Sequence, residues 1–226
     1  MGVGGRDLVP AMVLRFVERD YAVASVDYRG APDAIFPAQL EDVKRAIRRL
    51  KEYGADTGSV AADRIVVYGA SSGGILASLV AATPGRFEPV DDPVPQPGVD
   101  SAVAGVVSVV GPTDLVSLFD EPNPWAEGAI GIWLGCGPCT DTQLGAASPI
   151  DLLQPGLPPA YWAFGGLDAV VPAATQGPTM AEAWAEVAGA DNSWLDVVDG
   201  AGHNLDHTVL NQRAIEDFVD RAVGRG

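Results

Sequence analysis

The sequence predicts an α/β protein in which a mostly parallel sheet carries helices on both faces. Short runs of apolar, often β-branched residues alternate along the chain with segments of helical periodicity. Most of these runs are apolar throughout, as expected of strands buried on both faces of a parallel sheet. With 226 residues, 47% of them hydrophobic, and no internal repeat, the chain 1–226 is expected to form a single domain.

Five segments are predicted as strands because each is a short apolar run bounded by turn-forming residues. They are Tyr21–Tyr28, Arg64–Tyr68, Ala102–Val110, Ala160–Gly165 and Ser193–Val198. Five others have apolar residues at helical spacing. They are Leu8–Glu18, Pro37–Tyr53, Gly73–Ala82, Ala173–Ala188 and His207–Val223. The second of these begins with a proline, which suits a first helical turn, and Gly54 is expected to end it.

Two stretches interrupt this alternation. Residues 84–98 contain five prolines and are predicted to form a surface loop. Residues 118–159 are rich in proline and glycine and hold Trp125, Trp133 and both cysteines. Long segments of this kind in a compact domain are usually functional or locally ordered. We therefore expect a loop-rich excursion at about 118–159, whose aromatic residues line a binding pocket for small apolar groups.

The charge of the chain excludes some classes of partner. Thirty acidic residues against 14 basic ones give a net charge of −16. Such a surface repels the phosphates of nucleic acids and of anionic lipids, so neither nucleic acid nor a membrane is an expected partner.

The longest apolar runs are about nine residues, too short to cross a bilayer. Residues 1–6 lack the apolar core of a signal peptide, which makes the cytoplasm the default location.

The two cysteines, Cys136 and Cys139, lie in a Cys-Gly-Pro-Cys sequence. A redox motif of this type opens a helix after an early strand, whereas this pair follows a Trp-Leu-Gly loop late in the chain. A zinc site would need two more ligands, and only His203 and His207 offer imidazole nitrogens. A structural turn, reduced or disulfide-bonded, is the main interpretation, with redox and metal roles as alternatives.

The sharpest chemical signal is a Gly-x-Ser-x-Gly sequence, Gly69 to Gly73, between a predicted strand and a predicted helix. In this context the motif places a serine hydroxyl on a sharp turn above the strand ends. Ser71 is therefore the candidate nucleophile. The Ser72 N–H, at the helix N-terminus, is expected to stabilise a developing oxyanion. Both glycines are expected to leave room for the close strand–helix approach. The alternatives are a phosphate-binding glycine turn and a plain strand–helix turn.

A serine nucleophile needs a general base and a carboxylate that orients it. Of the two histidines, His203 follows the last predicted strand in a glycine-rich loop, whereas His207 begins the last predicted helix. We expect His203 to be the base, because a loop residue can lie over the serine. Asp168, just after the strand Ala160–Gly165, is the candidate acid, with helix capping as its alternative role. The rival carboxylates are Asp196, Asp199 and Asp206.

Several further motifs follow one another in a definite order. They are Tyr28–Pro32, Phe36–Ala38, Glu41–Asp42, Gly69–Gly74, Gly111–Leu115, Ala147–Ile150 and Gly202–His203. Together they resemble the α/β-hydrolase esterases of the hormone-sensitive-lipase and feruloyl-esterase-like groups, over nearly the whole chain. The resemblance implies an α/β-hydrolase fold and the chain order Ser71, Asp168, His203 for the triad.

We therefore expect a serine carboxylesterase that hydrolyses small or short-chain esters, aryl esters included, through an acyl-enzyme. Such chemistry needs a small-molecule ester as partner and neither a metal nor a cofactor. One alternative is a catalytically weak or inactive hydrolase-like protein that acts as a binding or assembly module. Another is an amidase or peptidase with the same triad.

The start of the chain departs from the family pattern. The family carries a His-Gly-Gly-Gly-type segment whose backbone N–H groups complete the oxyanion hole, and no histidine precedes the glycines of residues 1–6 here. Gly4 and Gly5 are the candidate donors, the alternative being a flexible N-terminus. The resemblance then implies an N-terminally truncated sheet in which Tyr21–Tyr28 pairs directly with Arg64–Tyr68. A homo-oligomer would cover the exposed edge, and a monomer with a rearranged N-terminus is the competing outcome.

Overall fold

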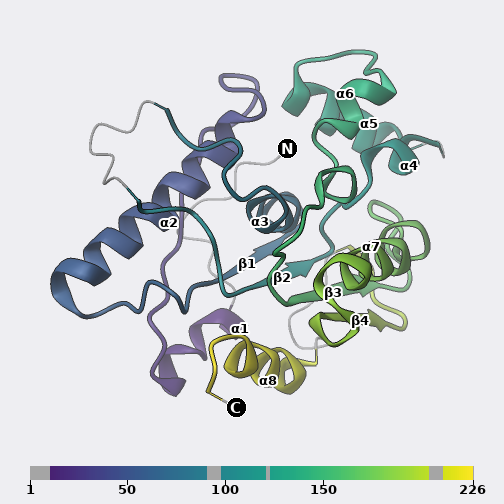
Figure 1. The fold of residues 1–226 in the computed structure, drawn as a ribbon. Helices are drawn as coiled ribbons and strands as arrows, with labels where there is room; N and C mark the ends of the chain where they lie inside the picture. The colour runs from purple at the N-terminus through teal and green to yellow at the C-terminus, as the bar shows by residue number, and fades with distance from the viewer. Residues whose placement is uncertain (1–10, 91–97, 121–122, 204–210, 226) are drawn as a thin grey trace.

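The centre of the molecule is a sheet of four parallel strands in the order β1-β2-β3-β4 (Figure 1). The structure is a computed structural model that describes residues 11–90, 98–120, 123–203 and 211–225. The strands are β1 (Val66–Ala70), β2 (Gly105–Val109), β3 (Ala160–Gly165) and β4 (Ser193–Val198). Four of the five predicted strands therefore exist, with bounds shifted by up to three residues, and the parallel α/β class is confirmed.

Four of the five predicted helices are present, with changes at their ends. In the described ranges the helices are α1 (Ala11–Leu14), α2 (Ala38–Thr57), α3 (Ser72–Ala82), α4 (Leu115–Asp120), α5 (Pro124–Leu134), α6 (Asp141–Gly145), α7 (Ala173–Ala188) and α8 (Gln212–Ala222). Short 3-10 turns cover Val17–Arg19, Pro149–Leu152 and Ala190–Asn192. In its described part, the predicted helix Leu8–Glu18 is reduced to α1 and a 3-10 turn, and α4, α5 and α6 were not predicted. The predicted helical residues 8–10 and 207–210, and residues 91–97 of the proline-rich loop, lie outside the described residues. Among the described helices, none is both long and apolar enough to cross a membrane.

Gly54 does not end α2, contrary to the prediction. The helix continues to Gly58, whose φ of 68° is the left-handed conformation that glycine adopts readily. Gly54 serves a close contact instead, because a Cβ atom there would lie 2.2 Å from the carbonyl oxygen of Val60. The glycine at position 54 is therefore explained by this close contact and does not mark the end of the helix.

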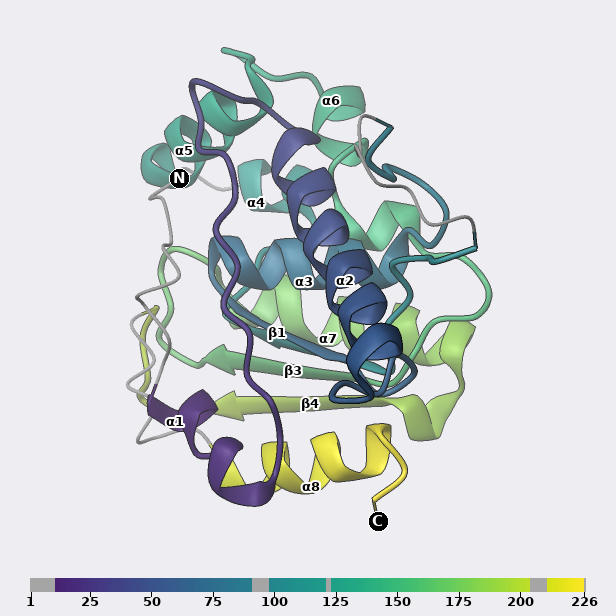
Figure 2. The same ribbon diagram turned by 90° about the vertical axis from the view of Figure 1, so that its left-hand side faces the viewer.

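Helices cover both faces of the sheet because successive residues of a strand point in opposite directions. Val106 of β2 and Trp162 of β3 belong to a core shared with α3 and α7. Their chain neighbours Val107 and Tyr161 belong to a second core shared with α8. Figures 1 and 2 show the same layers, with α2, α3 and α7 on one face and α1 and α8 on the other.

The segment Tyr21–Tyr28 is extended, but the prediction that it is a strand paired with β1 is wrong. It makes no backbone ladder with β1 in the described part of the chain. Tyr21 and Val23 pack in the core of the α8 face, whereas Val26 and Tyr28 pack in the core of α2 and α3. The segment therefore passes from one layer to the other, and Figure 2 shows it running steeply across the strands. The homo-oligomer stays a prediction, although the edge that suggested it is not a strand.

The excursion predicted at 118–159 is packed against α2 and α3. Its helices α5 and α6 and the end of α4 contribute to the same core as those two helices. The buried residues involved are Leu118, Ala126, Ile130, Trp133, Leu144, Ala147 and Leu152. Just after α5, Cys136 and Cys139 form a disulfide, which is one of the two states that the turn interpretation left open.

Candidate active site

Ser71 occupies the sharp turn between β1 and α3. Its backbone has φ 52° and ψ −115°, a conformation that non-glycine residues rarely adopt. The turn is held in place because the Ser71 N–H donates to the carbonyl of Val109, at the end of the neighbouring strand β2, at 2.8 Å. The serine therefore lies at the carboxyl edge of the parallel sheet, where the following loops of β3 and β4 also begin.

Two glycines make this turn sterically possible, and of the two predicted, Gly69 and Gly73, only Gly69 is one of them. A Cβ atom at Gly69 would lie 2.0 Å from the carbonyl oxygen of Gly73, and one at Gly74 would lie 2.8 Å from the Cα of Gly111. A Cβ atom at Gly73 would meet nothing within 4 Å. The expectation that Gly73 leaves room is therefore wrong. Gly74 has that part, because α3 packs closely against the chain just after β2.

The structure brings together the three predicted residues Ser71, His203 and Asp168. The Oγ atom of Ser71 lies 2.9 Å from Nε2 of His203, and Nδ1 of His203 lies 2.9 Å from Oδ2 of Asp168. The side chain of Asp168 is 0% exposed and that of His203 is 18% exposed. A serine, an imidazole and a buried carboxylate thus form one hydrogen-bonded chain that reaches solvent at the serine end.

The carboxylate of Asp168 is fixed by its own loop. Its Oδ1 atom accepts hydrogen bonds from the N–H groups of Val170, at 2.8 Å, and Val171, at 2.9 Å. This leaves Oδ2 directed at His203. The residue before α7 is Pro172, so Asp168 does not cap that helix, and its alternative role is not the one observed.

The loops that carry Asp168 and His203 are bonded to each other. The Leu167 N–H donates to the carbonyl of Ala201 at 2.8 Å, and the Gly166 N–H donates to that of Val198 at 2.9 Å. A side chain at Gly165 is excluded here, because its Cβ atom would lie 2.5 Å from the carbonyl oxygen of Ala201. The acid and the imidazole therefore sit on one cross-linked pair of loops after β3 and β4.

Of the rival carboxylates in the described residues, neither Asp196 nor Asp199 is the partner of His203, whose Nδ1 atom faces Asp168. Asp196 accepts a hydrogen bond from the hydroxyl of Tyr161 at 3.2 Å. Burial and the carboxylate of Asp196 raise the pKa of Tyr161 above its ordinary value. Asp206 and His207 lie outside the described residues, as do Gly4 and Gly5.

The Ser72 N–H is available as an oxyanion donor. Ser72 is the first residue of α3, and the N–H groups of Gly74 and Ile75 already donate to the Ser71 carbonyl. Within the described residues, the Ser72 N–H has no acceptor, as expected of a first helical turn. The hydroxyl of Tyr28 lies 3.3 Å from Oγ of Ser72. This tyrosine, from the extended segment before α2, was not identified as a site residue from the sequence.

A second neighbour of the site is Trp125, one of the aromatic residues of the excursion that were expected to line a binding pocket. The centre of its ring lies 6.2 Å from that of His203, and 59% of its surface is exposed. Asn123, two residues earlier, caps α5 and donates to the carbonyl of Val170 at 2.9 Å. The Asn-Pro sequence before Trp125 is a helix-start signal, but nothing in it predicts contact with the Asp168 loop.

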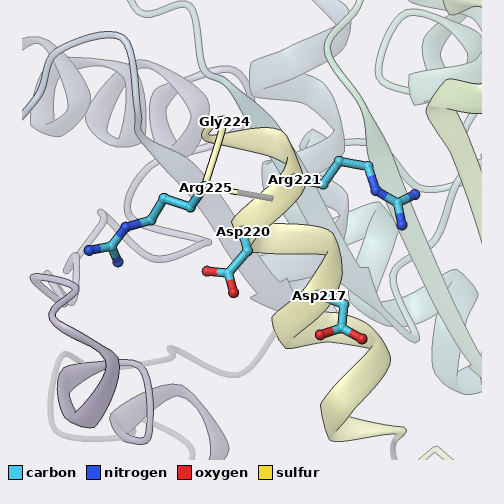
Figure 3. Close-up of a pocket in the computed structure, with 5 residues that line it drawn as sticks. All are labelled: Asp217, Asp220, Arg221, Gly224 and Arg225. Carbon is cyan, nitrogen blue, oxygen red and sulfur yellow. The ribbon is translucent and has the colours of Figure 1, made fainter.

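A separate pocket of about 490 Å³ lies at the end of α8 (Figure 3), lined by Asp217, Asp220, Arg221, Gly224 and Arg225. This end of α8 is next to the start of β2, because a Cβ atom at Gly105 would lie 2.9 Å from Cβ of Ala222. The pocket is therefore on the opposite edge of the sheet from Ser71. Asp220 is paired with Arg19 there.

Among the described residues, no group of three or more His, Cys, Asp or Glu side chains has the arrangement of a metal site.

The fold and this Ser–His–Asp geometry define an α/β hydrolase. The sequence profile of the BD-FAE family matches residues 4–183, and the chain belongs to that family. It is similar to esterase LipQ of Mycobacterium tuberculosis, with 30% identity over 98% of this chain and 53% of LipQ. It is also similar to the probable carboxylic ester hydrolase LipM of the same organism, with 30% identity over 71% of this chain and 37% of LipM. The chain spans about half the length of LipQ.

Solved structures resemble the chain in the same way. A truncated form of a carbohydrate esterase from gut microbiota has 25% identity and a TM-score of 0.76, over 88% of this chain and 73% of that one. A bifunctional GH43–CE protein of Bacteroides eggerthii has 26% identity and a TM-score of 0.77, over 93% of this chain and 28% of that one. The expected resemblance to esterases of the α/β-hydrolase fold is thus confirmed.

Proposed function

We propose that this chain carries the reaction centre of a serine carboxylesterase and that Ser71, His203 and Asp168 are its catalytic triad. The observation that carries the proposal is the pair of 2.9 Å contacts that join Ser71 to His203 and His203 to Asp168. Two further facts support it, namely the positive φ of Ser71 and the membership of a family whose relatives include proteins named as esterases.

In the proposed reaction, Oγ of Ser71 attacks the ester carbonyl while Nε2 of His203 accepts its proton. The negative oxygen of the tetrahedral intermediate accepts a hydrogen bond from the Ser72 N–H. When the intermediate collapses, His203 gives the proton to the leaving alcohol, and an acyl group remains on Ser71. Water then attacks this acyl-enzyme with His203 again as the base, which releases the acid and restores the serine.

Asp168 acts by holding His203. Its Oδ2 atom faces Nδ1, so the imidazole keeps its proton on Nδ1 and presents an unprotonated Nε2 to the serine. The buried carboxylate also stabilises the imidazolium that forms during each proton transfer. A second oxyanion donor is proposed from the backbone N–H of Gly4 or Gly5, and the loss of one such donor costs about 10²- to 10³-fold in rate.

The proposed substrates are small or short-chain carboxylic esters, aryl esters included. The solved relative described as a carbohydrate esterase adds acylated sugars to the esters worth testing. No metal or cofactor takes part in the proposed steps, since the nucleophile, base and oxyanion donor are all groups of the chain.

The test is hydrolysis of p-nitrophenyl acetate by the wild-type chain and by Ser71→Ala. Loss of turnover in Ser71→Ala, with full activity in the exposed control Ser59→Ala, supports the proposal. Labelling of Ser71 by a fluorophosphonate gives a second readout that does not depend on substrate choice. Equal turnover in Ser71→Ala and wild type would refute the nucleophile. A preference for the matching p-nitroanilide would instead indicate an amidase.

A further inference from the structure

Trp125 is a large aromatic side chain that remains exposed beside the proposed general base. Its indole is 59% exposed, although most indoles in proteins cover a large apolar surface in a core or an interface. Its ring centre lies 6.2 Å from that of His203, with the two planes inclined at 60°. One face of the site is therefore bordered by an apolar ring that packs against no other aromatic residue among those described.

This position is fixed by both ends of α5. At the start, Asn123 accepts a hydrogen bond from the Ala126 N–H at 3.1 Å and donates to the carbonyl of Val170 at 2.9 Å. At the far end, Trp133 is buried and its indole N–H donates to Gln39 at 3.1 Å. The helix cannot swing away without breaking contacts to both the Asp168 loop and α2, so the indole is held next to the imidazole.

The proposed reaction decides which part of a substrate would meet this ring. His203 must protonate the leaving oxygen, which has to approach within about 3 Å of Nε2. The carbonyl oxygen, in contrast, is directed to the Ser72 N–H. The alcohol part of the ester therefore lies next to the imidazole, whose ring centre is 6.2 Å from that of Trp125.

We propose that Trp125 is a stacking surface for the leaving alcohol and that it makes the enzyme prefer esters whose alcohol carries a six-membered ring. The inference rests on the proposed esterase function and names the part of the substrate that this residue selects. A phenol ring presents a planar face to an indole, and a pyranose ring presents the C–H groups on one side of its chair. Aromatic pairs favour offset or edge contacts at 4.5–7 Å between ring centres. Trp125 is expected to affect the preference for the alcohol part of the ester and not the preference for the acyl part.

The experiment compares kcat/KM ratios between the wild type and Trp125→Ala on two ester pairs. Phenyl acetate and ethyl acetate share the acyl group, whereas methyl benzoate and methyl butanoate share the alcohol. Taking the ratio within one enzyme and comparing enzymes cancels the difference in intrinsic leaving ability. We expect the phenyl-to-ethyl ratio to fall about threefold to tenfold in Trp125→Ala and the benzoate-to-butanoate ratio to change less than twofold. An acetylated methyl xyloside, set against ethyl acetate, tests the sugar ring in the same way.

Three controls accompany these measurements. Trp125→Phe keeps a ring face and should retain most of the preference. Tyr53→Ala removes an equally exposed aromatic from α2 and should leave every ratio unchanged. The midpoint of thermal unfolding of Trp125→Ala should match that of the wild type, because an exposed side chain contributes little to the core.

The outcomes separate this inference from the proposed function. A fall in the benzoate-to-butanoate ratio, or an equal fall on all esters, would overturn the stacking surface while leaving the triad in place. If Trp125→Ala lowers kcat/KM, relative to ethyl acetate, for phenyl acetate alone or for the acetylated xyloside alone, the result supports the inference and shows which kind of ring Trp125 contacts. If the wild type turns over no ester at all, the esterase function fails and the inference fails with it.

Discussion

Replacing Asp168 by Asn should abolish most activity while leaving the fold intact, and the structure shows why. Oδ1 of Asp168 accepts two backbone N–H groups, from Val170 and Val171, and Oδ2 faces Nδ1 of His203. An asparagine has one acceptor oxygen and one NH2 group. Its oxygen should stay with the two N–H donors, because turning the amide around would point NH2 at both of them and leave buried donors without acceptors.

The NH2 group would then face Nδ1 of His203, which must become an acceptor. The imidazole proton would move to Nε2, the atom that has to receive the serine proton. This wrong tautomer lowers kcat by about 10⁴-fold in a serine–histidine–aspartate enzyme. Because both backbone hydrogen bonds survive, the free energy of unfolding should change by less than about 1 kcal/mol.

The assay is kcat for p-nitrophenyl acetate together with thermal unfolding, for Asp168→Asn and for the control Asp196→Asn. Asp196 carries the same side chain on β4 but bonds to Tyr161, so the control should stay within about twofold of the wild-type kcat. If Asp168→Asn keeps more than a tenth of the wild-type kcat, the assignment of Asp168 as the orienting acid is refuted.

Three further predictions concern packing, charge and the disulfide. Gly69→Ala should destabilise the protein by more than about 2 kcal/mol, because the new Cβ atom would lie 2.0 Å from a carbonyl oxygen. Gly73→Ala, where the space is open, should be neutral or stabilising by up to about 1 kcal/mol in thermal unfolding. Burial lowers the pKa of Lys44, so the unfolded state binds more protons between that lowered value and the ordinary lysine value of about 10.4. Wild-type stability should therefore rise relative to Lys44→Met as the pH rises through this window, and a pH-independent difference would contradict it. The double variant Cys136→Ser, Cys139→Ser should keep both ester turnover and an unfolding midpoint close to the wild type, since the closed loop is very short and constrains the unfolded chain little.

The sequence predicts that Ser71, Asp168 and His203 share one site because each of them follows a strand in a short, recognisable motif. Ser71 lies in a Gly-x-Ser-x-Gly turn, and Asp168 and His203 lie in glycine-rich loops after the last two strands. Parallel strands bring their carboxyl ends to one edge, so three separate local signals are enough to predict a shared site.

The errors have a common physical cause, which is that local patterns do not specify tertiary neighbours. Tyr21–Tyr28 has the composition of a strand, and its side chains enter both cores as those of a strand would. Its backbone nevertheless makes no ladder with β1 in the described part of the chain, and composition alone does not report that. The position of Trp125 depends on contacts at both ends of α5, from Asn123 to Val170, 47 positions away, and from Trp133 to Gln39, 94 positions away. No spacing rule within one segment reports either contact.

Ser71, His203 and Asp168 are held by two separate parts of the fold, and β2 joins these two parts. The acid and the imidazole share one pair of cross-linked loops after β3 and β4, whereas the serine follows β1. At its end, β2 accepts the Ser71 N–H through Val109, and the next residue, Val110, donates to Ala163 of β3 at 2.7 Å. If the turn after β1 moved relative to the loops after β3 and β4, the Ser71–His203 contact would therefore lengthen before the His203–Asp168 contact did. The end of β2 therefore sets how Ser71 is aligned with His203, and substitutions there would change this alignment without altering Ser71, His203 or Asp168.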